Sequence, residues 1–158
     1  MKQKKTDVIA FDIDGTLADI SHRLHFIEGS KKDWDSFYAN MADDKPIQGM
    51  VDICNALWAA GHPIVFITGR PEKYRELTVD WLSKQFMPLF KYLVDINVAL
   101  HMRKDGDRRS DVEVKKEIYE NLKAKGIDVV MVFEDRSRVV QMWRDAGVRC
   151  LQVADGNY

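Results

Sequence analysis

The sequence has only two cysteines, Cys54 and Cys150, among 158 residues. Both lie within apolar patterns, and neither has further cysteines or histidines around it at a metal-binding spacing. Two isolated thiols cannot supply the framework of a small disulfide-stabilised fold. We therefore expect both cysteines to be buried and reduced, in keeping with a reducing compartment.

An excess of charge is also absent, because 24 Lys and Arg residues stand against 25 Asp and Glu residues, for a net charge of −1. No overall field attracts nucleic acid or a membrane, so any basic surface must be local. The first apolar run, residues 8–11, is far shorter than a signal-peptide core or a membrane span. No G-x-x-x-x-G-K-[ST] motif occurs, which excludes a P-loop kinase. We expect a cytoplasmic protein with no membrane partner.

Short apolar runs alternate with amphipathic segments along the chain. Solid apolar runs are typical of buried parallel strands, and the amphipathic segments between them, such as those at about 49–60 and from Ser110 onward, predict helices. The fold class is therefore α/β: a doubly wound parallel sheet of about five strands with helices on both faces. A chain of this length suits a single domain over residues 1–158. The expected strands lie at residues 8–11, 63–67, 95–102, 129–133 and 150–153.

About fifty residues separate the first two strands, too many for a plain crossover connection. We expect a small helical cap insertion at about residues 19–46. Within it Ser30 begins a variant capping box, and four apolar residues then follow at helical spacing. This stripe indicates core packing, with stacking on a nucleic-acid base as the alternative. Its members are Trp34, Phe37, Tyr38 and Met41.

Two further patterns in the sequence leave alternatives open. His22 and His25 lie three residues apart, a spacing that can bind zinc, but no further Cys or His lies nearby, so packing or a substrate contact is the favoured interpretation. A run of basic residues could contact a nucleic-acid backbone or form a solvated charged loop. The run comprises Arg103, Lys104, Arg108, Arg109, Lys115 and Lys116.

Polar residues follow three of the apolar runs directly. Asp12 and Asp14 come after the first, and two acids so close repel each other unless a cation or a shared proton neutralises them. Because the carboxyl ends of parallel strands meet at one edge of a sheet, we expect all three turns to lie together. The later turns carry Thr68, Gly69 and Arg70 and then Glu134 and Asp135, and Lys115 begins the helix before the last strand.

Such a set supplies what phosphoryl transfer requires. One carboxylate can act as nucleophile and another can move protons, while the remaining oxygens suit Mg²⁺. Thr and Lys side chains can hold phosphoryl oxygens. Each residue alone has a plainer interpretation as a turn or a solvated helix position, so the prediction depends on their order and placement together.

Residues 12–16 (D-I-D-G-T), Thr68, Lys115 and the acidic pair at 134–135 resemble the four ordered motifs of the haloacid dehalogenase (HAD) superfamily of phosphatases. The resemblance covers nearly the whole chain. It is most specific toward the 3′-phosphatase domains of bacteriophage polynucleotide kinases, chiefly over residues 114–118, 134–144 and 152–154. Thr68 stands where those domains have serine, and Glu134 where they have aspartate.

The resemblance implies a Mg²⁺-dependent phosphomonoesterase that acts through a phosphoaspartate. Asp12 is the implied nucleophile and Asp14 the implied acid and base. Asp111 is placed one helical turn before Lys115 and is expected to orient it. The implied catalytic residues are Asp12, Asp14, Thr68 and Lys115; the substrate-binding residues are Arg23, Gly69, Arg70 and Asp111; and the metal ligands are Asp12, the Asp14 carbonyl, Asp135 and, directly or through water, Glu134.

The expected substrate is the 3′-phosphate at a polynucleotide end, acted on by a free-standing phosphatase. A 5′(3′)-nucleotidase acting on nucleoside monophosphates is the alternative within enzymes. A receiver-like, phosphorylation-dependent binding module is the alternative outside them, but there the phosphoacceptor lies on the third strand. The D-x-D-G-T arrangement on the first strand and the long insertion after it favour turnover.

Overall fold

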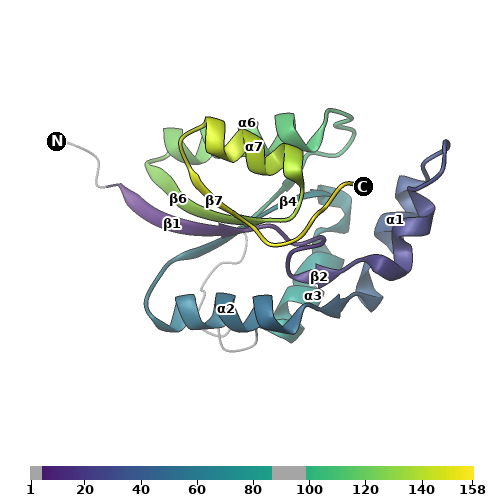
Figure 1. The fold of residues 1–158 in the computed structure, drawn as a ribbon, viewed down its shortest axis with the longest axis horizontal. Helices are drawn as coiled ribbons and strands as arrows, with labels where there is room; N and C mark the ends of the chain where they lie inside the picture. The colour runs from purple at the N-terminus through teal and green to yellow at the C-terminus, as the bar shows by residue number, and fades with distance from the viewer. Residues whose placement is uncertain (1–4, 87–98) are drawn as a thin grey trace.

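The protein is described by a computed structural model over residues 5–86 and 99–158, and it is built on one parallel sheet (Figure 1). The strand order is β5-β4-β1-β6-β7. This confirms the doubly wound α/β prediction; of the weak strand expected at 95–102, the part before residue 99 lies outside the described residues. The strands are β1 (Thr6–Phe11), β4 (Ile64–Pro71), β5 (Leu100–Arg103), β6 (Ile127–Glu134) and β7 (Arg149–Gln152).

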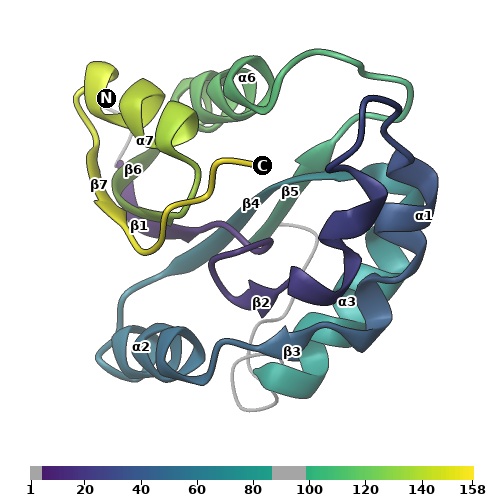
Figure 2. The ribbon, with the colours of Figure 1, turned by 45° about the vertical axis from the view of Figure 1, so that its right-hand side comes forward.

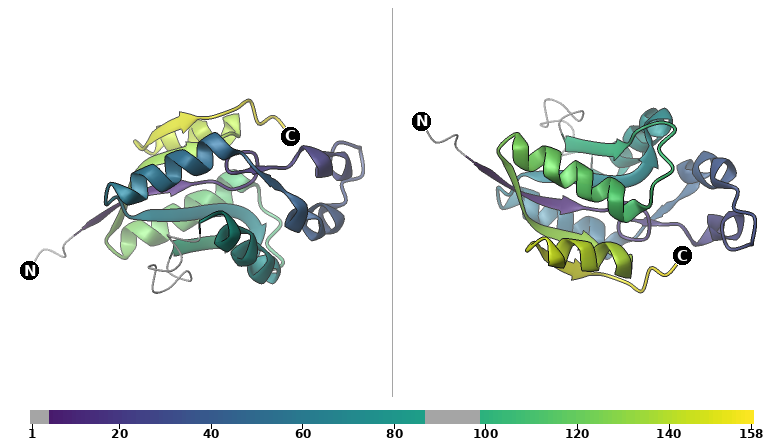
Figure 3. Two further views of the ribbon diagram at one scale, coloured as in Figure 1. Left: turned by 90° about the horizontal axis from the view of Figure 1, so that it is seen from below. Right: turned by 90° about the horizontal axis from the view of Figure 1, so that it is seen from above.

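Helices cover both faces of the sheet, as Figure 3 shows from its two sides. Side chains alternate along each strand, so β1 points Ile9 and Phe11 to one face and Val8 and Ala10 to the other. Each face has its own buried cluster, and burial of both holds the layers together. The first face packs against α2 (Gln48–Ala59) and α3 (Arg75–Gln85), and the second against α6 (Asp111–Ala124) and α7 (Ser137–Asp145).

The helix signals in the sequence are confirmed most clearly at α6. Its N-cap Ser110 accepts a hydrogen bond from the Glu113 backbone N–H, and the Glu113 carboxylate accepts one from the Ser110 backbone N–H. Gly126 follows the helix with a φ of 80°, a left-handed conformation that favours glycine. The capping box fixes where α6 begins and therefore where Lys115 lies relative to the sheet.

The insertion lies over the carboxyl ends of the strands (Figure 2). Two short antiparallel strands, β2 (Ala18–Asp19) and β3 (Lys45–Pro46), pair at its base. The helix α1 begins at Trp34 rather than near Ser30, because Asp33 is its N-cap and the Asp33 carboxylate accepts a hydrogen bond from the Ser36 N–H at 3.0 Å. Between the two strands are the 3₁₀ helix η1 (Ser21–Phe26), α1 (Trp34–Ala39) and a second 3₁₀ helix, η2 (Met41–Asp43).

The aromatic stripe of α1 divides between core and surface. Phe37 and Met41 are buried, as the packing interpretation predicts, whereas Trp34 is 38% exposed. The ring of Tyr38 lies between them and is half-buried. One end of α1 therefore anchors the insertion, and the other presents an aromatic surface.

Cys54 and Cys150 are both buried and unpaired, as predicted, and burial raises the pKa of each thiol to about 12. Over residues 5–86 and 99–158, no helix is long and apolar enough to cross a bilayer.

Candidate active site

The three polar turns predicted from the sequence meet at one edge of the sheet. Asp12 and Asp14 follow β1, Thr68 lies at the end of β4, and Glu134 and Asp135 close β6. All of them except Asp135 line a cavity of about 20 Å³, together with Gly69, Asp111 and Lys115. Of the other residues that line it, the sequence analysis gave Arg136 no role and did not single out Tyr158.

Lys115 lies buried between two carboxylates. Its Nζ donates to Asp12 Oδ1 at 2.6 Å and to Glu134 Oε2 at 2.7 Å. Burial, reinforced by the charge of Glu134 and offset in part by Lys115, raises the pKa of Asp12 from an ordinary 3.8 to about 7. Burial opposes the lysine charge as well, yet the two carboxylates hold the pKa of Lys115 above its usual range. The lysine therefore stays cationic.

Asp12, Glu134 and Asp135 form a buried acidic group whose offered oxygens all lie within 4.8 Å of one another. In the described part of the chain, Asp135 Oδ1 is buried without a hydrogen-bond partner. Burial, followed by the charge of Asp12, raises the pKa of Asp135 to about 6. Three buried carboxylates with one unpartnered oxygen fit a hard divalent cation such as Mg²⁺.

Glycines make room for the Asp135 carboxylate. A Cβ at Gly156 would lie 2.1 Å from Asp135 Oδ2, and a Cβ at Gly15 would lie 2.3 Å from it. Gly15 also has a φ of 80°, which strains any other residue. Beside it, the Asp14 carbonyl accepts a hydrogen bond from Tyr158 Oη at 2.8 Å. That carbonyl keeps a second lone pair for the role of metal ligand that the sequence predicts.

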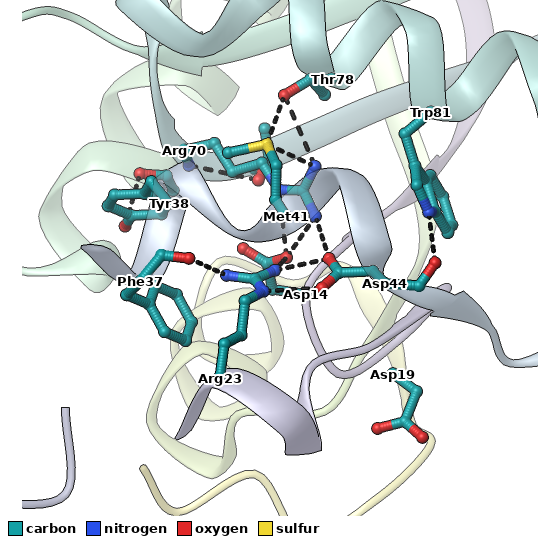
Figure 4. Close-up of polar contacts among 12 residues, drawn as sticks. Asp14, Asp19, Arg23, Phe37, Tyr38, Met41, Asp44, Arg70, Thr78 and Trp81 are labelled. Carbon is teal, nitrogen blue, oxygen red and sulfur yellow. Dashed lines mark hydrogen bonds and ion pairs between the residues drawn. The ribbon is translucent and has the colours of Figure 1, made fainter. Parts of the chain in front are cut away.

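Asp14 lies in the opposite kind of environment, between two guanidinium groups (Figure 4). Its Oδ1 accepts hydrogen bonds from Arg23 Nη2 at 2.6 Å and from Arg70 Nη2 at 2.5 Å. Burial alone would raise the pKa of Asp14, but the charges of Arg70 and Arg23 hold it below its usual range. Asp14 is therefore a carboxylate in the free protein, whereas the neighbouring Asp12 retains its proton up to about neutral pH.

The two arginines differ in position from what the sequence indicates. Arg23 and Arg70 were expected to bind a substrate phosphate, yet both side chains are fully buried behind Asp14. Their charges are committed to Asp14 and to Asp44, whose Oδ2 accepts from Arg23 at 2.6 Å and from Arg70 at 3.0 Å. The arginines thus hold Asp14 in place.

Asp44 is a site residue that sequence reasoning missed. It lies in an Asp-Asp-Lys-Pro stretch that has the composition of a surface turn, but it is only 5% exposed. The Trp81 indole donates to its backbone carbonyl at 2.7 Å, and His22 Nε2 lies 2.9 Å from its Oδ1. His22 thus pairs with Asp44, and the ring of His25 packs on Phe26. Among the described residues, neither histidine belongs to a group of three or more potential metal ligands.

Replacing Asp44 with asparagine should weaken this cluster. Asp44→Asn removes one of two anions that neutralise two buried guanidiniums, and we expect a loss of about 2–3 kcal/mol in the free energy of unfolding. Urea denaturation measures it. The matched control is Asp43→Asn, an exposed neighbour that should change stability by less than about 0.5 kcal/mol. Equal losses in the two variants would contradict the role given to Asp44.

Asp111 holds arginines rather than Lys115. Its carboxylate accepts hydrogen bonds from Arg103 and Arg136, and no direct bond joins it to Lys115 in the described structure. Arg103 also donates to the Gly69 carbonyl at 2.9 Å, and a Cβ at Gly69 would lie 2.6 Å from Asp111 Oδ1. Asp111 therefore does not make the expected contact that would orient Lys115. Through Arg103 it instead holds the turn at Gly69.

Nearly the whole chain matches a known protein family. A family model described as the polynucleotide kinase PNKP phosphatase domain matches residues 6–158. A protein of the Autographa californica nuclear polyhedrosis virus, named as a candidate bifunctional polynucleotide kinase/RNA ligase, is 30% identical over 137 residues. That match covers 85% of this chain but 17% of the viral protein, so the chain spans only a small part of that relative.

Solved structures of similar fold agree with the architecture. The structure of a Pnkp1/Rnl/Hen1 complex matches with a TM-score of 0.77 and 24% identity, over 98% of this chain and 47% of the other. The class C acid phosphatase from Bacillus anthracis matches with a TM-score of 0.64 and 18% identity, over 99% of this chain and 70% of the other. At these identities the likeness supports the fold alone.

Proposed function

Since the chain belongs to the family of HAD-type polynucleotide kinase phosphatase domains, we propose that it removes 3′-phosphates from polynucleotide ends through a phosphoaspartate. Membership makes it a phosphatase domain, and a receiver-like binding module is no longer supported. One observation carries the mechanism. Asp12 and Asp14 are only two residues apart, but their environments are opposite. Asp12 lies beside Lys115 and other carboxylates, whereas Asp14 lies between two guanidinium groups. Such a division suits separate roles for two carboxylates.

In the first step an oxygen of Asp12, in its ionised form, attacks phosphorus, the bond from phosphorus to the 3′ oxygen breaks, and phosphoaspartate forms. Asp14 begins as a carboxylate and takes the proton that a phosphomonoester monoanion carries. It then gives that proton to the leaving 3′ oxygen. Its Oδ2 is the suitable atom, because the arginines contact only Oδ1. Lys115 and Thr68 offer donors to the phosphoryl oxygens.

In the second step Asp14, again a carboxylate, takes a proton from water. The water oxygen attacks phosphorus, the bond to Asp12 breaks, and inorganic phosphate leaves. Asp14 finally returns the proton to phosphate or solvent. Arg23 and Arg70 act here by holding Asp14 at one position through both transfers.

Asp12, Glu134, Asp135 and the Asp14 carbonyl are the residues proposed to hold Mg²⁺. When bound, the ion supplies positive charge that offsets the charge on the phosphoryl oxygens. Mg²⁺ should also raise the Tm of the wild-type protein, because a ligand that binds only the folded state stabilises it. Asp135→Asn should lose most of that shift, a readout that does not depend on activity.

The test compares phosphate release from a 3′-phosphorylated oligonucleotide, deoxynucleoside 5′-monophosphates and the generic ester p-nitrophenyl phosphate. We expect kcat/KM for the oligonucleotide to exceed that for the mononucleotides by about 100-fold, a difference that a few extra contacts supply. EDTA should abolish release and Mg²⁺ should restore it. Preference for the mononucleotides would favour a 5′(3′)-nucleotidase, and failure on all three substrates would refute a phosphatase.

A further inference from the structure

A second and larger cavity, of about 680 Å³, opens beside the catalytic one. Helix α1 of the insertion forms one wall, and the segment before α6 together with the start of α7 forms the other. We call it the side groove. The two cavities are adjacent, because five residues line both of them: Trp34, Tyr38, Asp111, Arg136 and Tyr158.

The acidic residues of the side groove are already satisfied. Asp33 caps α1, and the other three acids of the lining each pair with at least one basic side chain. Their negative charge is therefore not available to repel an anionic ligand. The pairs are Asp35 with Lys73, Asp107 with Arg109, and Asp111 with Arg103 and Arg136.

Two arginines of the side groove have no such partner. Arg108, in the loop before α6, and Arg138, in the first turn of α7, are both exposed. Neither forms an ion pair within residues 5–86 and 99–158. They come from different elements yet line one groove, so the groove carries positive charge beyond what its own acids offset. Guanidinium groups of this kind bind phosphate.

An aromatic side chain faces the same groove. Trp34 is 38% exposed, and its ring stacks on Tyr38 with centroids 6.0 Å apart and planes 23° apart. The indole also makes an edge-to-face contact with the buried ring of Phe37, with ring centroids 5.7 Å apart, and this contact helps to hold it in position. Lys32 Nζ also lies 5.5 Å from the centroid of the Trp34 ring and adds a positive charge beside it. A partly exposed aromatic ring beside a basic groove is a combination by which proteins bind single-stranded nucleic acid.

We propose that the side groove binds the single-stranded segment of a polynucleotide that precedes its 3′-terminal phosphate. Arg108 and Arg138 contact backbone phosphates, and Trp34 stacks on a base. The inference rests on the proposed function, because the terminal phosphate must reach Asp12 while the strand lies in the groove. The side groove would then distinguish a polynucleotide end from a mononucleotide, because a mononucleotide has no preceding strand to occupy it.

The first test measures binding alone. A fluorescent DNA single strand of about eight nucleotides with a 3′-hydroxyl cannot be hydrolysed, so its anisotropy reports binding whether or not the protein is a phosphatase. The double variant Arg108→Gln/Arg138→Gln should raise the Kd about 10-fold near 0.1 M salt. The slope of log Kd against log salt should also decrease by about 1.4, the value for two phosphate contacts on a single strand. Trp34→Ala should raise the Kd about 10-fold without changing that slope.

The matched control is Lys84→Gln/Arg149→Gln, which removes two positive charges from exposed positions outside the groove. Its Kd should stay within about 2-fold of wild type, since exposed charges farther apart than a Debye length are largely screened. An equal loss in the control would mean that net charge rather than the groove sets affinity, which would overturn the proposal. An unchanged Kd in the groove variant would also overturn it.

A second test uses turnover. In the groove variant, kcat/KM for a 3′-phosphorylated oligonucleotide should fall about 10-fold relative to kcat/KM for p-nitrophenyl phosphate, mostly through KM. A blunt duplex carrying the same 3′-phosphate should be a poorer substrate than the single strand. If wild type hydrolyses p-nitrophenyl phosphate but the ratio does not move, the groove inference fails and the phosphatase assignment stands. If wild type hydrolyses neither ester, the proposed function fails and the anisotropy result decides the groove.

Discussion

Asp12→Asn should abolish phosphate release, lowering kcat by at least about 10⁴-fold for both the oligonucleotide and p-nitrophenyl phosphate. The amide cannot form the acyl phosphate, and losses of this size follow removal of a nucleophile. Rapid-quench assays with ³²P-labelled substrate should detect no protein-bound phosphate. Near-normal turnover would refute the role given to Asp12.

The same variant should fold at least as well as the wild type when metal is removed. Because burial raises the pKa of Asp12 to about 7, the unfolded chain loses this proton at lower pH than the folded chain does. The stability of the metal-free wild type therefore falls as pH rises from about 4 to 7. Asp12→Asn has no proton to lose, so its Tm in EDTA should fall less over that window.

Asp19→Asn is the matched control for both measurements. Asp19 is exposed at the base of the insertion, and its Oδ1 accepts a hydrogen bond from the Ser21 N–H at 2.9 Å, a role that an amide oxygen can keep. The variant should keep kcat within about 2-fold of wild type and its free energy of unfolding within about 0.5 kcal/mol of wild type. A large loss of activity in this control would point to a general sensitivity of the chain rather than to the chemistry of Asp12.

Lys115→Met should be both inactive and strongly destabilised. The lysine is 2% exposed and neutralises Asp12 and Glu134, so its removal leaves two buried carboxylates without their cation. We expect a loss of about 3–5 kcal/mol in the free energy of unfolding at pH 8 in EDTA, the range for a broken buried ion pair. Urea denaturation measures this loss.

The loss should shrink at pH 6. Without Lys115 the pKa values of Asp12 and Glu134 rise further, so the folded variant binds protons that the unfolded chain has released. Lower pH supplies those protons and restores stability. Lys116→Met, an exposed neighbour on the same helix, should lose less than about 0.5 kcal/mol at either pH. A loss in Lys115→Met that does not vary with pH would contradict this electrostatic account.

The sheet and its polar edge could be predicted because local rules decide them. Solid apolar runs such as the one ending at Phe133 can be buried only in a covered parallel sheet, and parallel strands bring their carboxyl ends to one edge. The S-x-x-E signal at Ser110 likewise fixed the start of α6, and with it the reach of Lys115 to Asp12. Neither inference required knowledge of contacts between distant segments.

Contacts across long sequence separations could not be predicted. Arg23 and Arg70 are 47 positions apart in the sequence and meet on one oxygen of Asp14, and no periodicity indicates that pairing. Asp44 looks like a turn residue in the sequence. Its burial could not be predicted, because it depends on contacts with Trp81 and both arginines, which are distant in the sequence. The basic run also divides: Arg103 is buried and paired with Asp111, whereas Arg108 is exposed and forms no ion pair in the described part of the chain. Only the three-dimensional arrangement separates structural arginines from available ones.

The short β2–β3 ladder at the base of the insertion has an evolutionary consequence. The ladder joins the two ends of the insertion, so the insertion is a closed loop on the body of the protein. The entropic cost of closing such a loop rises by only about 0.6 kcal/mol for each doubling of its length. Different segments could be grafted onto this junction and alter substrate preference while the sheet stays intact. Such a graft faces one restriction, because the native segment carries Arg23 and Asp44. A replacement that lacks both residues leaves Asp14 with Arg70 alone, so it must bring a second donor if Asp14 is to be held between two partners as it is here.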